Sequence, residues 1–399
     1  MKKTKEPWVP GFKASGIHCG IKASAPDLAL IVSDGPAVAA GVFTRSTLVG
    51  APVELSRQRV AAGRARAVVV NSGVSNVAMG ERGRKDAVQM TKRVAQSLPC
   101  AEKDVLVAST GVIGEPLPMA SLRSGIPMAV DSLSESGWLA AAEAIRTTDT
   151  FAKVASRKIR LGDQEVTIVG IAKGSGMIEP DMATMLSFLA TDAHVSPVYL
   201  RGVLRRVADR TFNRVSVDGE GSTSDSVIAL AGGAAQNPRI TNRRRPEAEA
   251  FEEAFCDVAE ELAQSLARDG EGATKLVTVV VSGARSAGEA DQAARRIANS
   301  MLVKTALFGG DPNWGRILQT VGAGRIAMRA EAVRVRLGGV TVFRRGASAG
   351  PAARKKAASR LSADSVAIEV DLGAGTHSAR MWTCDLSYDY VRINAEYTT

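Results

Sequence analysis

The stretch Lys173–Phe188 reads K-G-S-G-M-I-E-P-D-M-A-T-M-L-S-F. A glycine-rich turn and a proline precede the pair Ala183-Thr184, and an apolar run, Met185–Ala190, follows this pair directly. Short apolar runs bounded by turn residues are typical of buried β-strands. The stretch therefore predicts a strand of a large sheet that begins immediately after a threonine, and it raises the question of what that threonine does.

Thr184 has two interpretations on its spacing alone. A threonine hydroxyl is a weak nucleophile at neutral pH and needs an adjacent base. If the chain cuts its own bond between Ala183 and Thr184, the freed α-amine, with an ordinary pKa of about 8, suits that proton transfer. The hydroxyl would attack the Ala183 carbonyl, and water would then open the resulting ester. Pairs of Ala and Thr are common, however, and a buried strand residue is the commoner case.

Length and composition are those of an ordinary globular protein. The chain has 399 residues, of which 45% are hydrophobic and 23% charged, enough for one large or two ordinary domains. No run reaches the ~18 apolar residues of a membrane span, and no signal peptide is visible, so we expect a cytoplasmic protein. The three histidines lack metal-ligand spacing, and we expect no metal site. We expect reduced thiols, because no C-x-x-C pair occurs among Cys19, Cys100, Cys256 and Cys384.

The formal net charge of +10 does not indicate a nucleic-acid-binding protein. Arginine is spread along the chain, and aromatic residues make up only 4%. The densest basic runs, Arg243–Arg245 and Arg344–Lys356, are mixed with or followed by Gly, Ala, Ser and Pro, which is typical of solvated loops. A positive field favours acidic small substrates, and we expect no nucleic-acid partner.

Strand-like and helix-like segments alternate along the chain. Helical spacing of apolar residues occurs over 200–212, over 251–266 after Pro246, and over the alanine-rich segment 284–301. Apolar runs of strand length occur at Leu28–Val32, Ala67–Val70, Asp104–Ala108, Val166–Ile171, Met185–Ala190, Val227–Ala231, Leu276–Val281, Val333–Leu337, Val366–Val370 and Arg380–Cys384. This mixture predicts an α/β (α+β) protein with large sheets.

Three polar stretches are candidates for chemistry. Ser109–Gly114 follows a predicted strand and could offer backbone N–H groups to an oxyanion, although a plain strand-to-loop turn is the commoner case. Asp218–Asp225 lacks the spacing of a calcium loop, and we expect a turn between strands there. Asp269–Lys275 has glycines that suit the end of a helix, and its Glu271 could receive a cationic amine. No dinucleotide motif follows the first strand, which argues against nicotinamide chemistry.

Ordered motifs along nearly the whole chain resemble one enzyme family. The stretch from Lys173 to Leu186 is similar, almost letter for letter, to the self-cleavage motif of the ornithine acetyltransferase (glutamate N-acetyltransferase) family of arginine biosynthesis. The other matching motifs are G-F-K-A-S-G-I from Gly11, D-L-A-L-I-V-S-D from Asp27, A-A-G-V-F-T from Ala39, S-T-G-V-I-G from Ser109, T-T-D-T from Thr147, F-N-R-V-S-V-D-G from Phe212, D-G-E-G-A-T-K from Asp269, F-G-G-D-P-N-W-G-R-I from Phe308 and I-N-A-E-Y-T-T from Ile393.

The resemblance implies a fold and an assembly. The fold is an α/β sandwich of layered mixed sheets flanked by helices, of the type shared with the L-aminopeptidase/D-esterase relatives. The bond between Ala183 and Thr184 is cut in such proteins. Residues 1–183 would then be an α chain and residues 184–399 a β chain that starts with the nucleophile, usually in an α2β2 heterotetramer.

The resemblance also implies roles for individual residues. Thr184 is the implied nucleophile, and Thr110 and Gly111 are the implied oxyanion hole. Lys173 suits a substrate carboxylate, while Glu271 suits an amine of ornithine. Substrate contacts are implied at Thr147, Lys173, Thr184, Glu271, Asn394 and Thr399.

The implied reaction is a ping-pong transfer of acetyl from N2-acetylornithine to Thr184 and then to glutamate. It needs no metal or cofactor, and acetyl-CoA is an additional donor in some members of the family. Two alternatives stay open. One is a related acyltransferase, amidohydrolase or aminopeptidase of specialised metabolism that uses the same threonine, and the other is an uncleaved scaffold or binding protein. The sequence departs from the family pattern at Val74, Arg45 and Arg146, which bears on the choice of acyl donor and acceptor.

Overall fold

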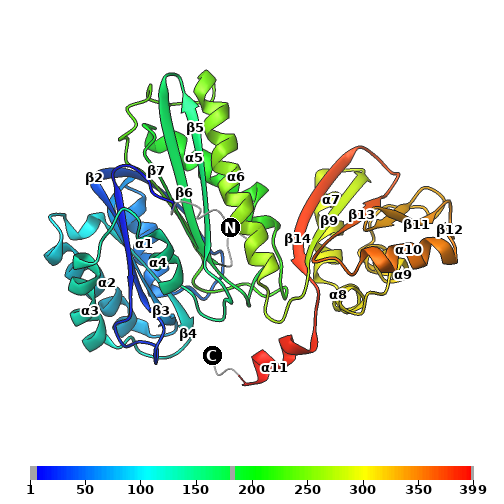
Figure 1. Ribbon diagram of the computed structural model, residues 1–399, viewed down its shortest axis with the longest axis horizontal. Coiled ribbons are helices and arrows are strands. Elements are labelled where there is room, and N and C mark those ends of the chain that lie inside the picture. Colours follow the sequence, from blue (N-terminus) through cyan, green and yellow to red (C-terminus); the bar gives the residue numbers. More distant parts are fainter. Residues whose placement is uncertain (1–6, 180–184, 397–399) are drawn as a thin grey trace.

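The computed structural model describes residues 7–179 and 185–396. Within these ranges the strands form one sheet of eight strands and one of six. Figure 1 shows a larger lobe built on the first sheet and a smaller lobe built on the second, with the long helix α6 (Pro246–Arg268) between them. The prediction of layered mixed sheets flanked by helices is confirmed.

The larger sheet combines segments from both sides of residues 180–184. Its order is β4-β3-β2-β8-β7-β6-β5, and β1 pairs with the first six residues of β2, Leu28 to Ser33. The pairs β3–β4 and β7–β8 are parallel, and the others are antiparallel. The strands are β1 (Phe12–Ile17), β2 (Leu28–Phe43), β3 (Arg64–Val74), β4 (Val105–Val112), β5 (Lys153–Leu161), β6 (Gln164–Lys173), β7 (Leu186–Thr191) and β8 (Ser226–Ala231).

Alternating side chains of the larger sheet enter different cores, as the two-residue period of a strand requires. In β2, Leu28 and Leu30 pack with α2 and α3, whereas Ala29 and Ile31 join a central core that contains Trp138 of α4. A third core lies between β5–β8 and the helices α5 and α6. The helices of this lobe are α1 (Ala51–Val60), α2 (Gly80–Ser97), α3 (Met119–Asp131), α4 (Trp138–Ala144), α5 (Pro197–Arg210) and α6.

The smaller lobe packs a sheet of order β12-β11-β10-β13-β9-β14 against helices. Its strands are β9 (Leu276–Ala284), β10 (Arg334–Leu337), β11 (Val340–Arg344), β12 (Ala347–Ser348), β13 (Ser365–Asp371) and β14 (His377–Cys384). Its helices are α7 (Ala287–Asn299), α8 (Met301–Phe308), α9 (Trp314–Ala323) and α10 (Pro351–Arg360). The last helix, α11 (Tyr388–Glu396), runs from β14 back toward the larger lobe (Figure 1).

Two predicted boundaries differ from the structure. The segment 284–301, predicted as one helix, contains the end of β9, all of α7 and the start of α8. The Ser286 hydroxyl accepts from the Glu289 N–H at 3.2 Å and begins α7, and the Ser300 hydroxyl begins α8 in the same way.

Among the described residues no helix is long and apolar enough to cross a membrane.

Candidate active site

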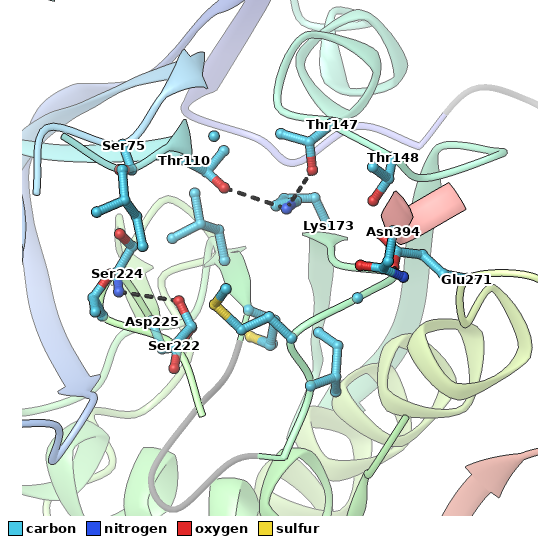
Figure 2. A pocket seen from close by; sticks show the side chains of 18 residues that line it. Ser75, Thr110, Thr147, Thr148, Lys173, Ser222, Ser224, Asp225, Glu271 and Asn394 are labelled. Atoms are coloured by element: carbon cyan, nitrogen blue, oxygen red, sulfur yellow. Dashed lines mark hydrogen bonds between the residues drawn. The ribbon is translucent and has the colours of Figure 1, made fainter. Parts of the chain in front are cut away.

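One cavity collects the predicted site residues that the structure describes. It has a volume of about 860 Å³ measured out to its open mouth. The six predicted residues that line it are Thr110, Gly111, Thr147, Lys173, Glu271 and Asn394. Ala183, Thr184 and Thr399 lie outside the described residues, but Met185 and Leu186, which follow Thr184 directly, also line the cavity. Figure 2 shows Lys173 at the centre, with Glu271 and Asn394 on one side and Asp225 on the other.

Thr110 and Gly111 lie at the end of β4, where the backbone geometry admits only glycine at position 111. Gly111 has a φ of +128°, which L side chains rarely adopt. A Cβ built there would lie 2.3 Å from the carbonyl carbon of Gly73 on the neighbouring strand β3. The Thr110 hydroxyl oxygen accepts a hydrogen bond from the Lys173 ammonium at 3.3 Å. The glycine thus keeps the end of β4 against β3 and holds the backbone at the wall of the cavity.

Lys173 is the cation of the cavity. It ends β6, is buried, and donates to the Thr147 hydroxyl at 2.8 Å and to Thr110 (Figure 2). Burial lowers the pKa of the Lys173 ammonium, and the neighbouring carboxylates of Asp149 and Asp225 only partly offset this. A substrate carboxylate that enters the cavity would supply the additional negative charge that favours the protonated form of Lys173.

A buried ion cluster lies directly behind Lys173 and Thr147. The Lys153 ammonium, whose side chain is 0% exposed, lies 2.7 Å from an Asp149 oxygen and 2.5 Å from an Asp269 oxygen. Asp149 also accepts from the backbone N–H of Gly174 at 2.6 Å and of Thr147 at 3.0 Å. Burial would raise the pKa of the Asp149 carboxyl, but Lys173, Lys153 and the Gly174 N–H outweigh it and hold this pKa well below its usual range.

Glu271 is the carboxylate at the mouth of the cavity. The Asn394 side chain of α11 donates to a Glu271 oxygen at 2.8 Å, and the Glu271 backbone N–H donates to the Ser175 carbonyl at 3.0 Å. A Cβ at Gly176 would lie 2.4 Å from the Glu271 carboxyl carbon, so the glycine lets this carboxylate approach. Glu271 is half-buried, and its hydrogen bond with Asn394 places α11 beside the cavity. A carboxylate in this position can bind a cationic amine.

Asp225 is a residue of the cavity wall that the sequence did not single out. It is 3% exposed and immediately precedes β8. Burial raises the pKa of its carboxyl well above the usual range, although the neighbouring Ser222 and Lys173 act in the opposite direction. The predicted turn between strands is instead a loop that follows a short 3-10 helix and lines the cavity from Ser222 to Asp225. The acidic and small residues of this loop were its only signal in the sequence.

The positions where the sequence departs from the family pattern have structural partners or packing roles. Arg146 donates to the Asp149 carbonyl at 2.7 Å and so closes the turn that carries Thr147. Val74 packs partly buried at the end of β3, and its carbonyl accepts from the Asn71 side chain at 2.8 Å. Neither Val74 nor Arg146 is among the residues that line the cavity.

The cavity combines three chemical features that suit a small amino-acid derivative. Lys173 offers a cation for a carboxylate, Glu271 offers a carboxylate for an amine, and the end of β4 places Thr110 and Gly111 in the cavity wall. Ile113 and Leu186 are among the apolar side chains that line the remaining wall. Within 7–179 and 185–396 no group of three or more His, Cys, Asp or Glu side chains could hold a metal ion.

Comparisons with known proteins give one consistent result. The profile of the ArgJ family matches residues 13–399. The arginine biosynthesis bifunctional protein ArgJ of Synechococcus sp. is 50% identical over 98% of this chain and 96% of its own length. The protein of the same name from Geobacter sulfurreducens is 46% identical over 98% of this chain and all of its own length. A crystal structure of ArgJ from Bacillus halodurans matches with 41% identity and a TM-score of 0.52, and it covers 54% of this chain and 100% of that chain.

Proposed function

The chain belongs to the ArgJ family, and from this premise we propose that it transfers acetyl from N2-acetylornithine to glutamate after cutting itself before Thr184. The expectation of an enzyme of arginine biosynthesis is confirmed by the relatives, which carry that process in their names. The observation that carries the proposal is the convergence of Thr110, Thr147, Lys173 and Glu271 in one cavity next to Met185.

The proposed substrate contacts follow from charge. Ornithine and glutamate share an α-carboxylate, and Lys173 is the buried cation that can bind it. N2-acetylornithine also carries a side-chain ammonium, for which Glu271, oriented by Asn394, is the matching carboxylate. Both substrates would use this pocket in turn, which is compatible with a ping-pong reaction. We keep Thr147 as a substrate contact because its hydroxyl already lies 2.8 Å from the Lys173 ammonium.

The proposed chemistry needs a nucleophile and an oxyanion hole. The Thr184 α-amine takes the proton of the Thr184 hydroxyl, and the hydroxyl oxygen attacks the acetyl carbonyl carbon. Thr110 and Gly111 stabilise the oxyanion, and each such donor is worth roughly 2.7–4 kcal/mol in other acyl-transfer enzymes. Collapse of the tetrahedral intermediate breaks the bond to the ornithine nitrogen, which takes the proton. Glutamate then attacks the acetyl-threonine ester by the same route and leaves as N-acetylglutamate.

The length of the solved relative supports the proposed cut. The crystallised Bacillus halodurans chain is matched over its whole length, yet it covers only 54% of this chain. Residues 184–399 are 216 of the 399 residues, which is the same 54% share. The curated relatives, in contrast, match 98% of this chain as single sequences. A full-length precursor and a solved chain of about half that length are what a cut near residue 184 produces.

Several finer expectations remain predictions. These are the α chain 1–183, the β chain 184–399, their α2β2 assembly, the cytoplasmic location, a substrate contact at Thr399, and a reaction without cofactor. Acetyl-CoA as an additional acetyl donor is a separate question, which an assay with acetyl-CoA and glutamate alone answers. The alternative of an amidohydrolase or aminopeptidase shares the nucleophile and differs in the acceptor, which would be water.

Intact mass spectrometry tests the proposal. The purified protein should give two pieces that end and begin at the Ala183–Thr184 bond, instead of one chain of 41.7 kDa. After incubation with N2-acetylornithine, the piece that begins at Thr184 should gain one acetyl group and lose it again when glutamate is added. Thr184→Ala should remain a single, inactive chain. An active single chain would refute self-cleavage, and acetate release at the same rate without glutamate would identify a hydrolase.

A further inference from the structure

The loop Val217–Ser226 contacts the chain on both sides of residues 180–184. On the upstream side, the Val217 N–H donates to the Ile178 carbonyl at 2.7 Å, and the Glu179 N–H donates to the Glu220 carbonyl at 2.9 Å. On the downstream side, the Ser226 N–H donates to the Met185 carbonyl at 3.0 Å. One continuous loop therefore fixes both ends of the five-residue segment that contains the proposed cut.

Asp218 makes the strongest of these contacts. One of its carboxylate oxygens accepts from the Met177 N–H at 2.7 Å, and the other accepts from the Ile178 N–H at 2.9 Å. Met177 has a φ of +55°, in the left-handed region that residues other than glycine rarely adopt. Hydrogen bonds to a charged acceptor are stronger than neutral ones. Asp218 thus binds the backbone before the proposed cut at a residue whose conformation is uncommon for a side chain other than glycine.

Glu179 adds a second anchor, which reaches the smaller lobe. Its carboxylate accepts from the Arg295 guanidinium at 2.9 Å and from the Asn299 amide at 2.7 Å, and both donors lie on α7. The Ser216 hydroxyl donates to the Asn299 carbonyl oxygen at 2.5 Å and so fixes which end of the amide faces Glu179. The Glu179 side chain is 17% exposed, and its position is set by two donors rather than by one surface ion pair.

We propose that the loop Val217–Ser226, with Asp218 and Glu179 as positioning residues, is the template that aligns the chain for its own cleavage. This inference rests on the proposed cut before Thr184. Attack of a hydroxyl on the preceding carbonyl needs the two atoms about 3–3.5 Å apart with a defined approach. Fixing both ends of a short segment removes most of the conformations that miss this geometry. The same contacts would keep residues 1–179 attached to the rest of the protein after the cut.

A time course of cleavage tests the template. The full chain is made by cell-free translation, synthesis is stopped, and the fraction of cleaved protein is followed on denaturing gels. Asp218→Ala removes the carboxylate that accepts from the Met177 and Ile178 N–H groups. We expect cleavage to slow by about a hundredfold, roughly tenfold for each of these two charged hydrogen bonds. Asp218→Asn keeps one acceptor oxygen and should fall between wild type and Asp218→Ala. Glu179→Gln should slow cleavage by roughly tenfold because the charged contact to Arg295 is lost.

Two control variants separate the template from other roles of this region. Glu220→Gln removes a charge from the same loop but keeps the main-chain carbonyl that binds Glu179, so cleavage should keep the wild-type rate. The Tyr390 hydroxyl donates to Asp218 at 3.3 Å, and Tyr390→Phe should therefore also cleave at the wild-type rate if the amide contacts are what matters. Thermal unfolding of each uncleaved chain shows whether it is folded at the assay temperature.

The outcomes are distinct. A wild-type chain that never cleaves overturns the proposed function itself. A wild type that cleaves while folded Asp218→Ala and Glu179→Gln cleave at the same rate overturns the template and leaves the proposed function intact. If Asp218→Ala does not fold, the order of rates among wild type, Asp218→Asn and Glu179→Gln decides: slower cleavage of both folded variants supports the template, and unchanged cleavage refutes it.

Discussion

Replacing Lys153 by methionine should destabilise the protein strongly, although the substitution keeps most of the side-chain volume. Lys153 is 0% exposed and lies between Asp149 and Asp269, at 2.7 and 2.5 Å. Methionine leaves the two buried carboxylates without the cation that they share. Breaking a buried ion pair by removing one partner costs about 3–5 kcal/mol, because an uncompensated charge stays in the interior. We expect the free energy of unfolding to fall by about this amount at pH 7.

The surroundings of the two carboxylates set where in that range the cost lies. Asp149 keeps the N–H groups of Gly174 and Thr147 and the field of Lys173, so part of its charge remains compensated. Asp269 keeps the Thr150 N–H at 3.1 Å and the Thr150 hydroxyl. Both carboxylates therefore retain neutral donors, and we place the cost near the lower end, at about 3 kcal/mol.

The dependence on pH has a definite sign. The folded pKa of Asp149 is held below its unfolded value of about 3.9, so its contribution is fully present above that pH and is lost as the pH falls toward the folded pKa. Without Lys153 this folded pKa rises. The difference between wild type and Lys153→Met should therefore stay at its full size from neutral pH down to about 4 and shrink as the pH falls further.

Urea unfolding at several pH values measures this effect, and Lys158→Met on the same strand is the matched control. Lys158 lies 2.7 Å from Glu165, but the two side chains are 52% and 63% exposed. Exposed pairs contribute about 0–1 kcal/mol. The double variant Lys153→Met with Asp269→Asn should be less destabilised than the sum of the single variants. A loss below 1 kcal/mol for Lys153→Met, or strict additivity, contradicts the account of a compensated buried cluster.

Two further substitutions test other parts of the cavity. Gly111→Ala should lower acetyl transfer by more than about a hundredfold, because its Cβ would lie 2.3 Å from Gly73 and displace the proposed oxyanion donors. Gly114→Ala, where φ is +84° but the surrounding space is open, should keep most of the activity. Equal losses in both variants would argue against a role specific to position 111. Asp225→Asn should raise the free energy of unfolding at pH 7–8. Burial raises the folded pKa of the Asp225 carboxyl, so the wild-type protein loses stability as the pH rises above the unfolded pKa of about 3.9. The free energies of unfolding of both proteins in urea should converge near pH 4, and a less stable variant at pH 8 would contradict the raised pKa.

Much of the larger sheet could be predicted from local patterns. The runs at Leu28–Val32, Val166–Ile171 and Val227–Ala231 are continuous apolar segments, and each lies within a strand that the structure buries on both faces. The helix after Pro246 was predictable for the same reason, since its apolar residues recur at helical spacing. Boundaries were less predictable where a serine cap divides one apolar segment, as at Ser286, because the cap is a single polar side chain.

The candidate site was predictable only through ordered motifs. Thr147, Lys173 and Glu271 come from three separate elements, and no local pattern indicates that they meet in one cavity. Nothing in the local sequence indicates that Lys153 is buried, because a lysine at the start of a strand usually lies on the surface. Its burial depends on Asp269, which is 116 positions away. The role of Asp218 could not be predicted for the same reason, since its carboxylate binds the backbone N–H of Met177, which lies 41 positions earlier in the sequence.

The order of strands in the larger sheet bears on when the proposed cut can occur. β7 pairs with β6 on one side and with β8 on the other, and β8 pairs with β2. The segment after Thr184 thus contributes only β7 and β8, in the middle of a sheet whose other strands come from the segment before it. Two strands with both edges exposed are at best marginally stable. We therefore expect β7 and β8 to enter the sheet while the chain is still continuous, so that the proposed cleavage follows folding, and a precursor unfolded in urea should stay uncleaved until it refolds.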